Sequence, residues 1–136
     1  MFPVIDLPWP HKDLSPNSRK HWAARSKLVK AYRWQCALLV KKALVKTGLN
    51  PVPSKARLAA GDLLRLQIDF YPPDRRHRDD DNVIASFKAG RDGLADALGI
   101  DDRYFTTKPT LHRDDPIASG LVRVTLSVDS AGTKRR

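Results

Sequence analysis

Two stretches of this chain alternate apolar and polar side chains, which strongly limits the structures that they can form. Residues 64–70 place Leu, Leu, Ile and Phe at every second position, and residues 121–128 do the same with Val and Leu. Because successive side chains of a strand point to opposite faces of a sheet, each stretch predicts a half-buried strand. Residues 4–7 predict a short strand before Pro8-Trp9-Pro10, and residues 107–113 predict one broken by Pro109.

Helical patterns lie between these strands. From residue 19 to 46, apolar residues recur near the helical period, and Lys or Arg fill many of the other positions. A second pattern covers residues 82–98, and Gly48 and Gly99 are typical of helix C-termini. The order β–α–β–α–β–β predicts an α+β fold with a small mixed β-sheet and two main helices. We expect one domain over residues 1–128 and a flexible basic tail over 129–136.

The charge balance predicts a polyanionic partner. The net charge is +10 and the isoelectric point is about 10.1, which favours nucleic acid, although a generic basic protein such as a ribosomal component has the same composition. Cys36 is the only cysteine, which excludes an intramolecular disulfide and a zinc site built from cysteines. With neither an apolar stretch of about 20 residues nor a signal-peptide pattern, we expect a cytoplasmic protein that does not enter membranes.

A dense acidic cluster interrupts the basic chain. Asp79-Asp80-Asp81-Asn82 directly follows Arg75-Arg76-His77-Arg78, and a second pair, Asp101-Asp102, comes later. Adjacent carboxylates repel one another unless a cation lies among them, and Mg²⁺ prefers such oxygen ligands. All fifteen acidic residues are Asp, which excludes nuclease motifs that need Glu and the Glu of an EF-hand loop. Helix capping is the simpler interpretation, but it leaves the basic residues and the later pair unexplained.

One polar stripe follows the acidic cluster on the second helix. At about 100° per residue, Asp81, Lys88 and Asp92 fall within some 40° of one another. Lys88 could form an i,i+4 ion pair with Asp92, which would be only weakly stabilising at the surface. Alternatively, its ammonium could lie near the metal and stabilise charge on a phosphate or a leaving oxygen. The sequence leaves both interpretations open.

Several of these segments together resemble the RusA-like Holliday junction resolvases (crossover junction endodeoxyribonucleases). The shared elements are Leu7-Pro8-Trp9-Pro10 after the first strand, Pro73-Asp74-Arg75-Arg76, Arg78-Asp79-Asp80-Asp81-Asn82 before a helix, and Asp101-Asp102. The resemblance covers almost the whole chain, and the combination of the last two elements is fairly specific. It implies a Mg²⁺-dependent endodeoxyribonuclease, acting as a homodimer on four-way junctions and related branched DNA in recombination and repair.

The resemblance also assigns residues to the site. It implies that Asp79, Asp81 and Asp102 bind Mg²⁺, with Mn²⁺ as a possible substitute. The family's catalytic lysine position is occupied here by Ala85, and Lys88, one turn further along the same face, is expected to take that role.

Basic residues on the first helix and before the aspartates are expected to hold the DNA backbone. They are Arg19, Lys20, Arg25, Lys27, Arg75, Arg76 and Arg78. The helix could instead present a solvated basic face that keeps the protein soluble. Two rival functions remain, a non-catalytic nucleic-acid-binding protein whose aspartates are caps, and a nuclease with a broader range of branched substrates.

One geometric problem concerns Asp102. A straight helix over residues 82–98 would be about 25 Å long. Because Asp102 lies four residues beyond it, the chain could return only about 14 Å toward Asp81. Either the helix is shorter or bent near Gly90 or Gly93, or Asp102 joins the site of a second subunit, which the two-fold symmetry of a dimer would permit.

Overall fold

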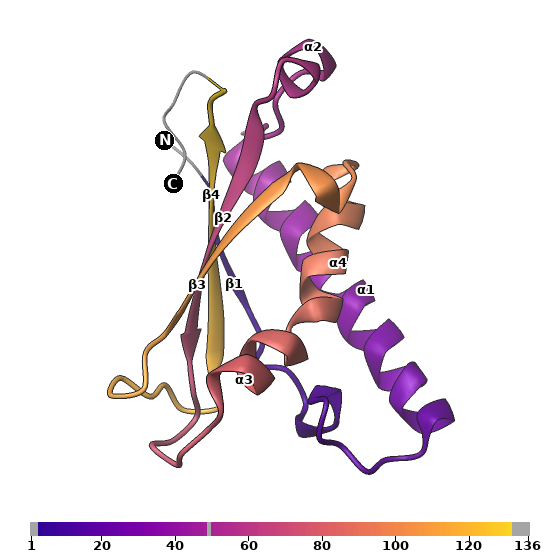
Figure 1. Ribbon diagram of the computed structural model, residues 1–136, viewed down its shortest axis with the longest axis vertical. Coiled ribbons are helices and arrows are strands. Elements are labelled where there is room, and N and C mark those ends of the chain that lie inside the picture. Colours follow the sequence, from indigo (N-terminus) through magenta and orange to yellow (C-terminus); the bar gives the residue numbers. More distant parts are fainter. Residues whose placement is uncertain (1–2, 49, 132–136) are drawn as a thin grey trace.

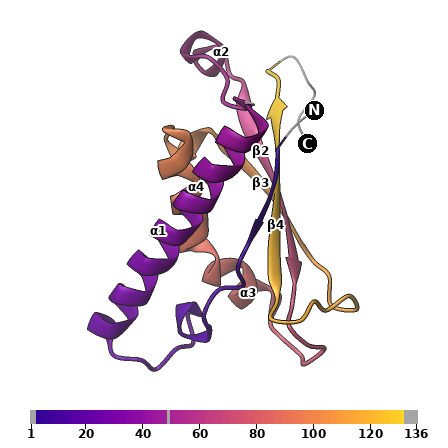
Figure 2. The same cartoon turned by 180° about the vertical axis from the view of Figure 1, so that it is seen from behind.

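The two long helices lie on the same side of a twisted four-stranded sheet (Figures 1 and 2). The computed structural model describes residues 3–48 and 50–131. Its helical elements, where η marks a short 3₁₀ helix, are η1 (Lys12–Leu14), α1 (Trp22–Thr47), α2 (Lys55–Ala59), α3 (Asp80–Ser86), α4 (Lys88–Leu98) and η2 (Asp102–Tyr104). Its strands are β1 (Val4–Leu7), β2 (Leu63–Tyr71), β3 (Phe105–Leu111) and β4 (Leu121–Asp129).

The sheet is mixed, with strand order β1-β4-β2-β3. β4 pairs antiparallel with both β1 and β2, whereas β2 and β3 are parallel. The alternation predicted for β2 and β4 is observed, because Leu64, Leu66, Ile68 and Phe70 are buried with Val122, Val124 and Leu126. These side chains form one core with α1 and α4, through residues such as Cys36, Val40 and Leu94. The predicted α+β class, with a small mixed sheet and two main helices, is therefore confirmed.

Local predictions also hold at most element ends. Gly48 and Gly99 follow α1 and α4 with φ angles of 67° and 68°, the left-handed conformation that favours glycine at these positions. Two details differ. Pro109 does not break β3, because β3 is an edge strand where the missing N–H costs no ladder hydrogen bond. The connector predicted over 50–61 contains α2, whose first turn is capped by the Ser54 side chain.

The first residue of the tail predicted over 129–136 is part of the sheet. Asp129 is still part of β4, where it pairs with Leu63, and residues 132–136 lie outside the described part of the chain.

The predicted second helix is divided at Phe87. This residue has φ −91° and ψ 3°, between α3 and α4, and the break falls neither at Gly90 nor at Gly93. The Phe87 ring is buried, with edge-to-face contacts to Phe70 and Tyr32 at centroid distances of 5.8 and 6.3 Å. The ring also covers Gly90, where a Cβ would lie only 2.3 Å from its Cε1. Burial of this aromatic side chain thus accounts for the change of helix direction.

Gly93 lets α1 and α4 approach each other closely. A Cβ at this position would lie 2.5 Å from the carbonyl oxygen of Arg33 and 3.1 Å from the amide nitrogen of Ala37. Both are backbone atoms of α1, so a side-chain rotation cannot relieve the contact. Gly93 is therefore required by packing between the helices.

We expect Gly93→Ala to lower the free energy of unfolding by about 1–3 kcal/mol, the usual cost of overpacking a core. The measurement is urea unfolding of Gly93→Ala and of the unchanged protein, followed by circular dichroism. The two free energies are compared with one common slope for their dependence on urea concentration. In an unobstructed helix the same substitution would raise stability by up to about 1 kcal/mol. An increase in the free energy of unfolding would therefore contradict the close contact between α1 and α4.

Candidate metal site and nucleic-acid interface

Three of the four sequence motifs meet at one end of the sheet, the lower end in Figure 1, where the segment after β1, the loop after β2, α3 and the loop between β3 and β4 gather, whereas Asp101-Asp102 follows α4 at the other end. The Tyr32 hydroxyl donates to the carbonyl oxygen of Pro8 at 2.6 Å and ties the segment after β1 to α1. The loop after β2 is tied to the β3–β4 loop, because the amide of Ile117 donates to the carbonyl oxygen of Pro72 at 3.0 Å. These two hydrogen bonds fix the segments around the acidic cluster relative to α1 and to the β3–β4 loop.

The three adjacent aspartates have different environments. Asp79 caps α3, and its Oδ1 accepts from the amides of Asp81 and Asn82 at 2.9 and 3.4 Å. Asp80 forms an ion pair with Arg113. Asp81 is exposed, and its carboxylate makes no ion pair or side-chain hydrogen bond with any residue that the structure describes. Capping thus explains Asp79 and an ion pair explains Asp80, whereas neither explains Asp81.

Two of the arginines that were predicted to contact DNA make hydrogen bonds within the protein. The Arg78 side chain is only 14% exposed, pairs with Asp74 at 2.9 Å, and donates to the carbonyl oxygens of Asp74 and Arg76. The hydrogen bond from Arg78 lowers the pKa of the Asp74 carboxyl. Arg25 donates to the carbonyl oxygens of Asp13 and Leu14, both at 3.2 Å. These hydrogen bonds indicate a positioning role for both residues, although Nε and Nη2 of Arg78 and Nη1 of Arg25 are not used in them.

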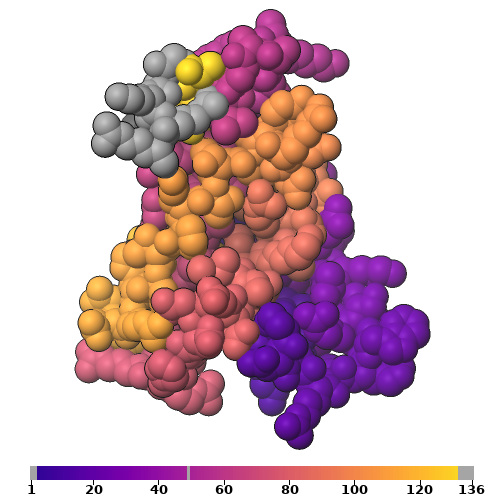
Figure 3. All heavy atoms as spheres, in the orientation of Figure 1, coloured from indigo at the N-terminus to yellow at the C-terminus, as the bar shows by residue number. Residues whose placement is uncertain are grey.

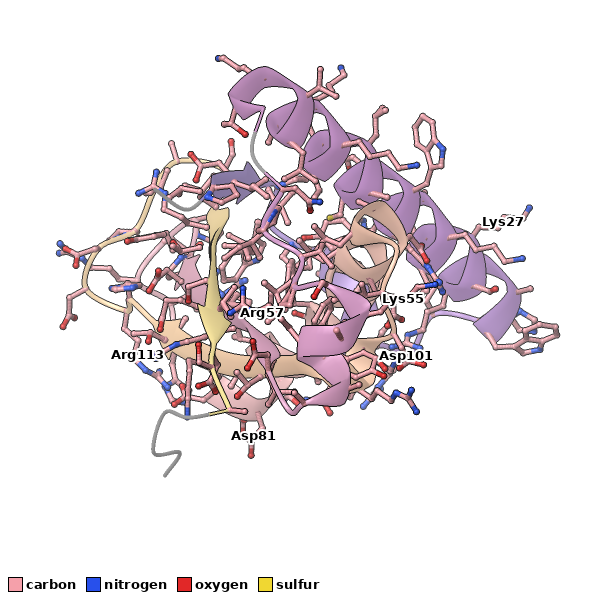
Figure 4. All side chains as sticks on the ribbon, turned by 90° about the horizontal axis from the view of Figure 1, so that it is seen from above. Lys27, Lys55, Arg57, Asp81, Asp101 and Arg113 are labelled. Carbon is pink, nitrogen blue, oxygen red and sulfur yellow. The ribbon has the colours of Figure 1, made fainter. Side chains whose placement is uncertain are left out.

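The other predicted basic residues are exposed: Arg19, Lys20, Lys27, Arg75 and Arg76. Lys20 also lies 3.5 Å from Asp13, and Lys27 extends outward from α1 (Figure 4). Arg75 and Arg76 border a cavity of about 240 Å³ together with His77 and Arg113. Arg78 and one carboxylate, Asp114, also line this cavity, and Arg113 connects it to the acidic cluster through its ion pair with Asp80.

Lys88 lies at the start of α4. Its ammonium is 3.3 Å from the Asp92 carboxylate, and its side chain is 76% exposed, so the predicted i,i+4 pair is present. The same side chain borders a groove of about 310 Å³ between α3, α4 and the two parallel strands. Arg91 also borders this groove, which gives it two cations.

Asp102 is not close to the other two predicted metal ligands. Its carboxylate accepts from Arg91 at 3.2 Å, and Arg91 also donates to the Thr107 hydroxyl at 3.3 Å. Asp101 caps η2 by accepting from the amide of Arg103 at 2.9 Å. The later acidic pair thus consists of one cap and one ion-paired carboxylate.

Helix α4 separates the two acidic groups. It leads away from α3 over 11 residues, which corresponds to about 16 Å, before the chain reaches Asp102 (Figure 1). Viewed from above, Asp81 points outward from the molecule, away from Asp101 (Figure 4). Among residues 3–48 and 50–131, no group of three His, Cys or Asp side chains is arranged to hold a metal ion. The break at Phe87 therefore does not bring Asp79, Asp81 and Asp102 together within one chain.

The sequence analysis did not identify Arg91 or Arg113, the partners of Asp102 and Asp80. Arg91 had a detectable signal, because it lies three residues after Lys88 and shares a helix face with it. Arg113 had none, since its contact with Asp80 depends on how the β3–β4 loop folds against α3.

Fold and site define a small basic α+β domain with an acidic cluster at the end of its sheet. No protein-family model matches the sequence. An uncharacterized protein of Xylella fastidiosa (strain Temecula1 / ATCC 700964) is 46% identical over 123 residues, which are 90% of this chain and 74% of that protein. The chain belongs to the same family as this uncharacterized protein. In the described part of the chain, no helix combines the length and apolar character needed to cross a membrane.

Proposed function

We propose that this protein is a Mg²⁺-dependent endodeoxyribonuclease of the RusA-like type, which cuts four-way junctions and related branched DNA as a homodimer. The observation that carries the proposal is the exposed Asp81 carboxylate, which has no protein partner among the described residues and stands beside Asp79 on a cationic surface. An unpaired carboxylate next to a second one is suited to a hard divalent cation. The motifs shared with the resolvases point to the same two residues.

The chain's own groups suit a phosphodiester substrate. Asp79 retains an oxygen that its capping bonds do not use, so Asp79 and Asp81 together could hold one Mg²⁺. A bound Mg²⁺ supplies Lewis acidity toward water and the scissile phosphate. Arg75 and Arg76 would hold the neighbouring phosphates of the strand, and Lys88 would approach the charge that develops in the transition state.

Asp102 would complete the site from the second subunit. Arg91 partly neutralises its carboxylate, which is half-exposed at the first residue of η2. Since α4 separates it from Asp81 of its own chain, a two-fold dimer offers a route by which both could reach one ion. Two such sites would suit a four-way junction, which itself has two-fold symmetry.

A second candidate function is supported by the capping bonds of Asp79 and the ion pair of Asp80 with Arg113. If the Asp81 carboxylate only stabilises α3 through its interaction with the helix dipole, it has no role in catalysis. The protein would then bind nucleic acid through its basic surface without cutting it. A third candidate is a nuclease that also cuts flaps and other branched DNA.

Cleavage of synthetic DNA separates these functions. We expect the protein to cut a four-way junction in Mg²⁺ or Mn²⁺ and to leave it intact in EDTA, while flap and plain duplex are cut far more slowly. Binding of all substrates without cutting would support the non-catalytic protein. Equal cutting of flap and junction would support the broader nuclease, and no binding to any DNA would exclude all three.

Lys88→Ala tests the catalytic role of the exposed lysine. If its ammonium stabilises the transition state, the single-turnover cleavage rate should fall by about 100-fold or more, with little change in junction affinity. Asp92→Ala is the matched control, because it removes the same ion pair and keeps the cation. If only the pair matters, both variants should show the same small loss of stability and cut normally.

A further inference from the structure

A cavity of about 390 Å³ opens directly beside the acidic cluster. It lies between the segment that follows β1, the loop that precedes α3, and α3 itself; Figure 3 shows these segments against each other in its lower half. Its apolar walls are Trp9, Pro10, Pro73 and Val83, and its charged lining comprises Lys12, Arg76 and Arg78 together with Asp79. A cavity of this size that combines apolar walls with converging polar groups is typical of a site for a small ligand.

The aromatic wall of this cavity is held rigidly. The Trp9 ring packs edge-to-face on Phe70 at a centroid distance of 6.3 Å, and the Arg78 guanidinium lies 5.9 Å from its centroid. The backbone of Gly120 also approaches Trp9 closely, since a Cβ there would lie 2.6 Å from the Trp9 Cβ. The indole therefore forms a fixed surface before any ligand arrives.

Two neutral polar groups of the cavity, on Asn82 and Ser86, suit the edge of a flat ring. Asn82 contributes an amide that both donates and accepts, and the Ser86 hydroxyl donates to the carbonyl oxygen of Val83 at 2.6 Å, which leaves its lone pairs as acceptors. A nucleobase offers a face to the aromatic wall and an edge to the Asn82 amide, while Lys12 and Arg76 carry the charge that attracts the phosphates on either side of that base.

We propose that this cavity takes one unstacked nucleobase of the DNA strand whose phosphate lies at Asp79 and Asp81, an inference that rests on the proposed nuclease function. Drawing a base out of a duplex breaks its pairing and stacking, and the free-energy cost is least where the base is already unpaired or poorly stacked. Bases at the branch point of a junction meet this condition. The cavity would therefore contribute to the preference for branched DNA, independently of the metal-binding aspartates.

The test compares binding of intact junctions with junctions that lack one base near the cleavage site, measured in EDTA so that no cutting occurs. We expect one abasic position to weaken binding by about tenfold or more. Ser86→Leu, which fills the cavity, should bind the intact junction about as weakly as the unchanged protein binds the abasic one, and should no longer respond to base removal. Ser127→Leu, on the other face of the sheet, is the matched control and should retain the full response.

Photo-crosslinking of the unchanged protein gives a second measurement that needs no variant. A 5-iodouracil at the sensitive position should crosslink to Trp9, as located by mass spectrometry of the peptides. Three results would overturn the base site: an equal response of Ser86→Leu and the unchanged protein to base removal, crosslinks only to residues other than Trp9, or no position at which base removal weakens binding. Mg²⁺-dependent cleavage would still support the nuclease in each case. Absence of junction binding and cleavage would remove the proposed function and the base site with it.

Discussion

Asp81→Asn should reduce Mg²⁺-dependent junction cleavage by about a thousandfold or more, while junction affinity in EDTA stays within a few-fold of that of the unchanged protein. The substitution keeps the size of the side chain and removes the charge that a divalent ligand needs. The described residues give this carboxylate no ion pair, so folding should be unaffected. The measurement is single-turnover cleavage over a range of Mg²⁺ concentrations, beside equilibrium binding.

Asp80→Asn is the matched control, since it makes the same change one residue away, at a carboxylate that pairs with Arg113. We expect it to cut at close to the normal rate and to lose at most about 1 kcal/mol of stability. If the two substitutions lowered the cleavage rate equally, the total negative charge of the cluster would matter, and Asp81 would not be a specific metal ligand. Normal cutting by Asp81→Asn would remove Asp81 from the site.

Mixing two inactive variants should restore cleavage if the site is shared between subunits. Asp81→Asn and Asp102→Asn homodimers are each expected to be inactive. Their heterodimer would contain one site with both ligands intact and one with both altered, so it should nick one strand of the junction. The measurement is strand-specific nicking after subunit exchange, which differently tagged chains verify.

The control for this experiment mixes Asp79→Asn with Asp81→Asn. Both positions lie at the start of α3, so no heterodimer of these two chains contains an intact site in either arrangement. Recovery in the first mixture alone would support a site built across the dimer. No recovery after verified exchange would contradict it, and Asp102 would then have another role, as the surface partner of Arg91.

Much of the fold could be predicted because its signals are local. The alternation in β2 and β4 defines their buried faces, and the positions of Gly48 and Gly99 mark the ends of α1 and α4, since each depends on the backbone of a few neighbouring residues. The prominence of Asp79 and Asp81 is also local, because it arises from charge repulsion between adjacent residues. None of these inferences required knowledge of distant contacts.

The sequence by itself determined the four strands, the helical segments around α1 and α3–α4, their order and the position of the acidic cluster. Only the tertiary structure decided how the elements meet. Phe87 breaks the second helix because its ring packs between Phe70 and Tyr32, which are distant in the sequence. Arg78 lies against Trp9, and Asp102 pairs with Arg91, with α4 between it and Asp81 of the same chain. Such contacts follow from the packing of helices and loops against the sheet, which no short stretch of sequence specifies.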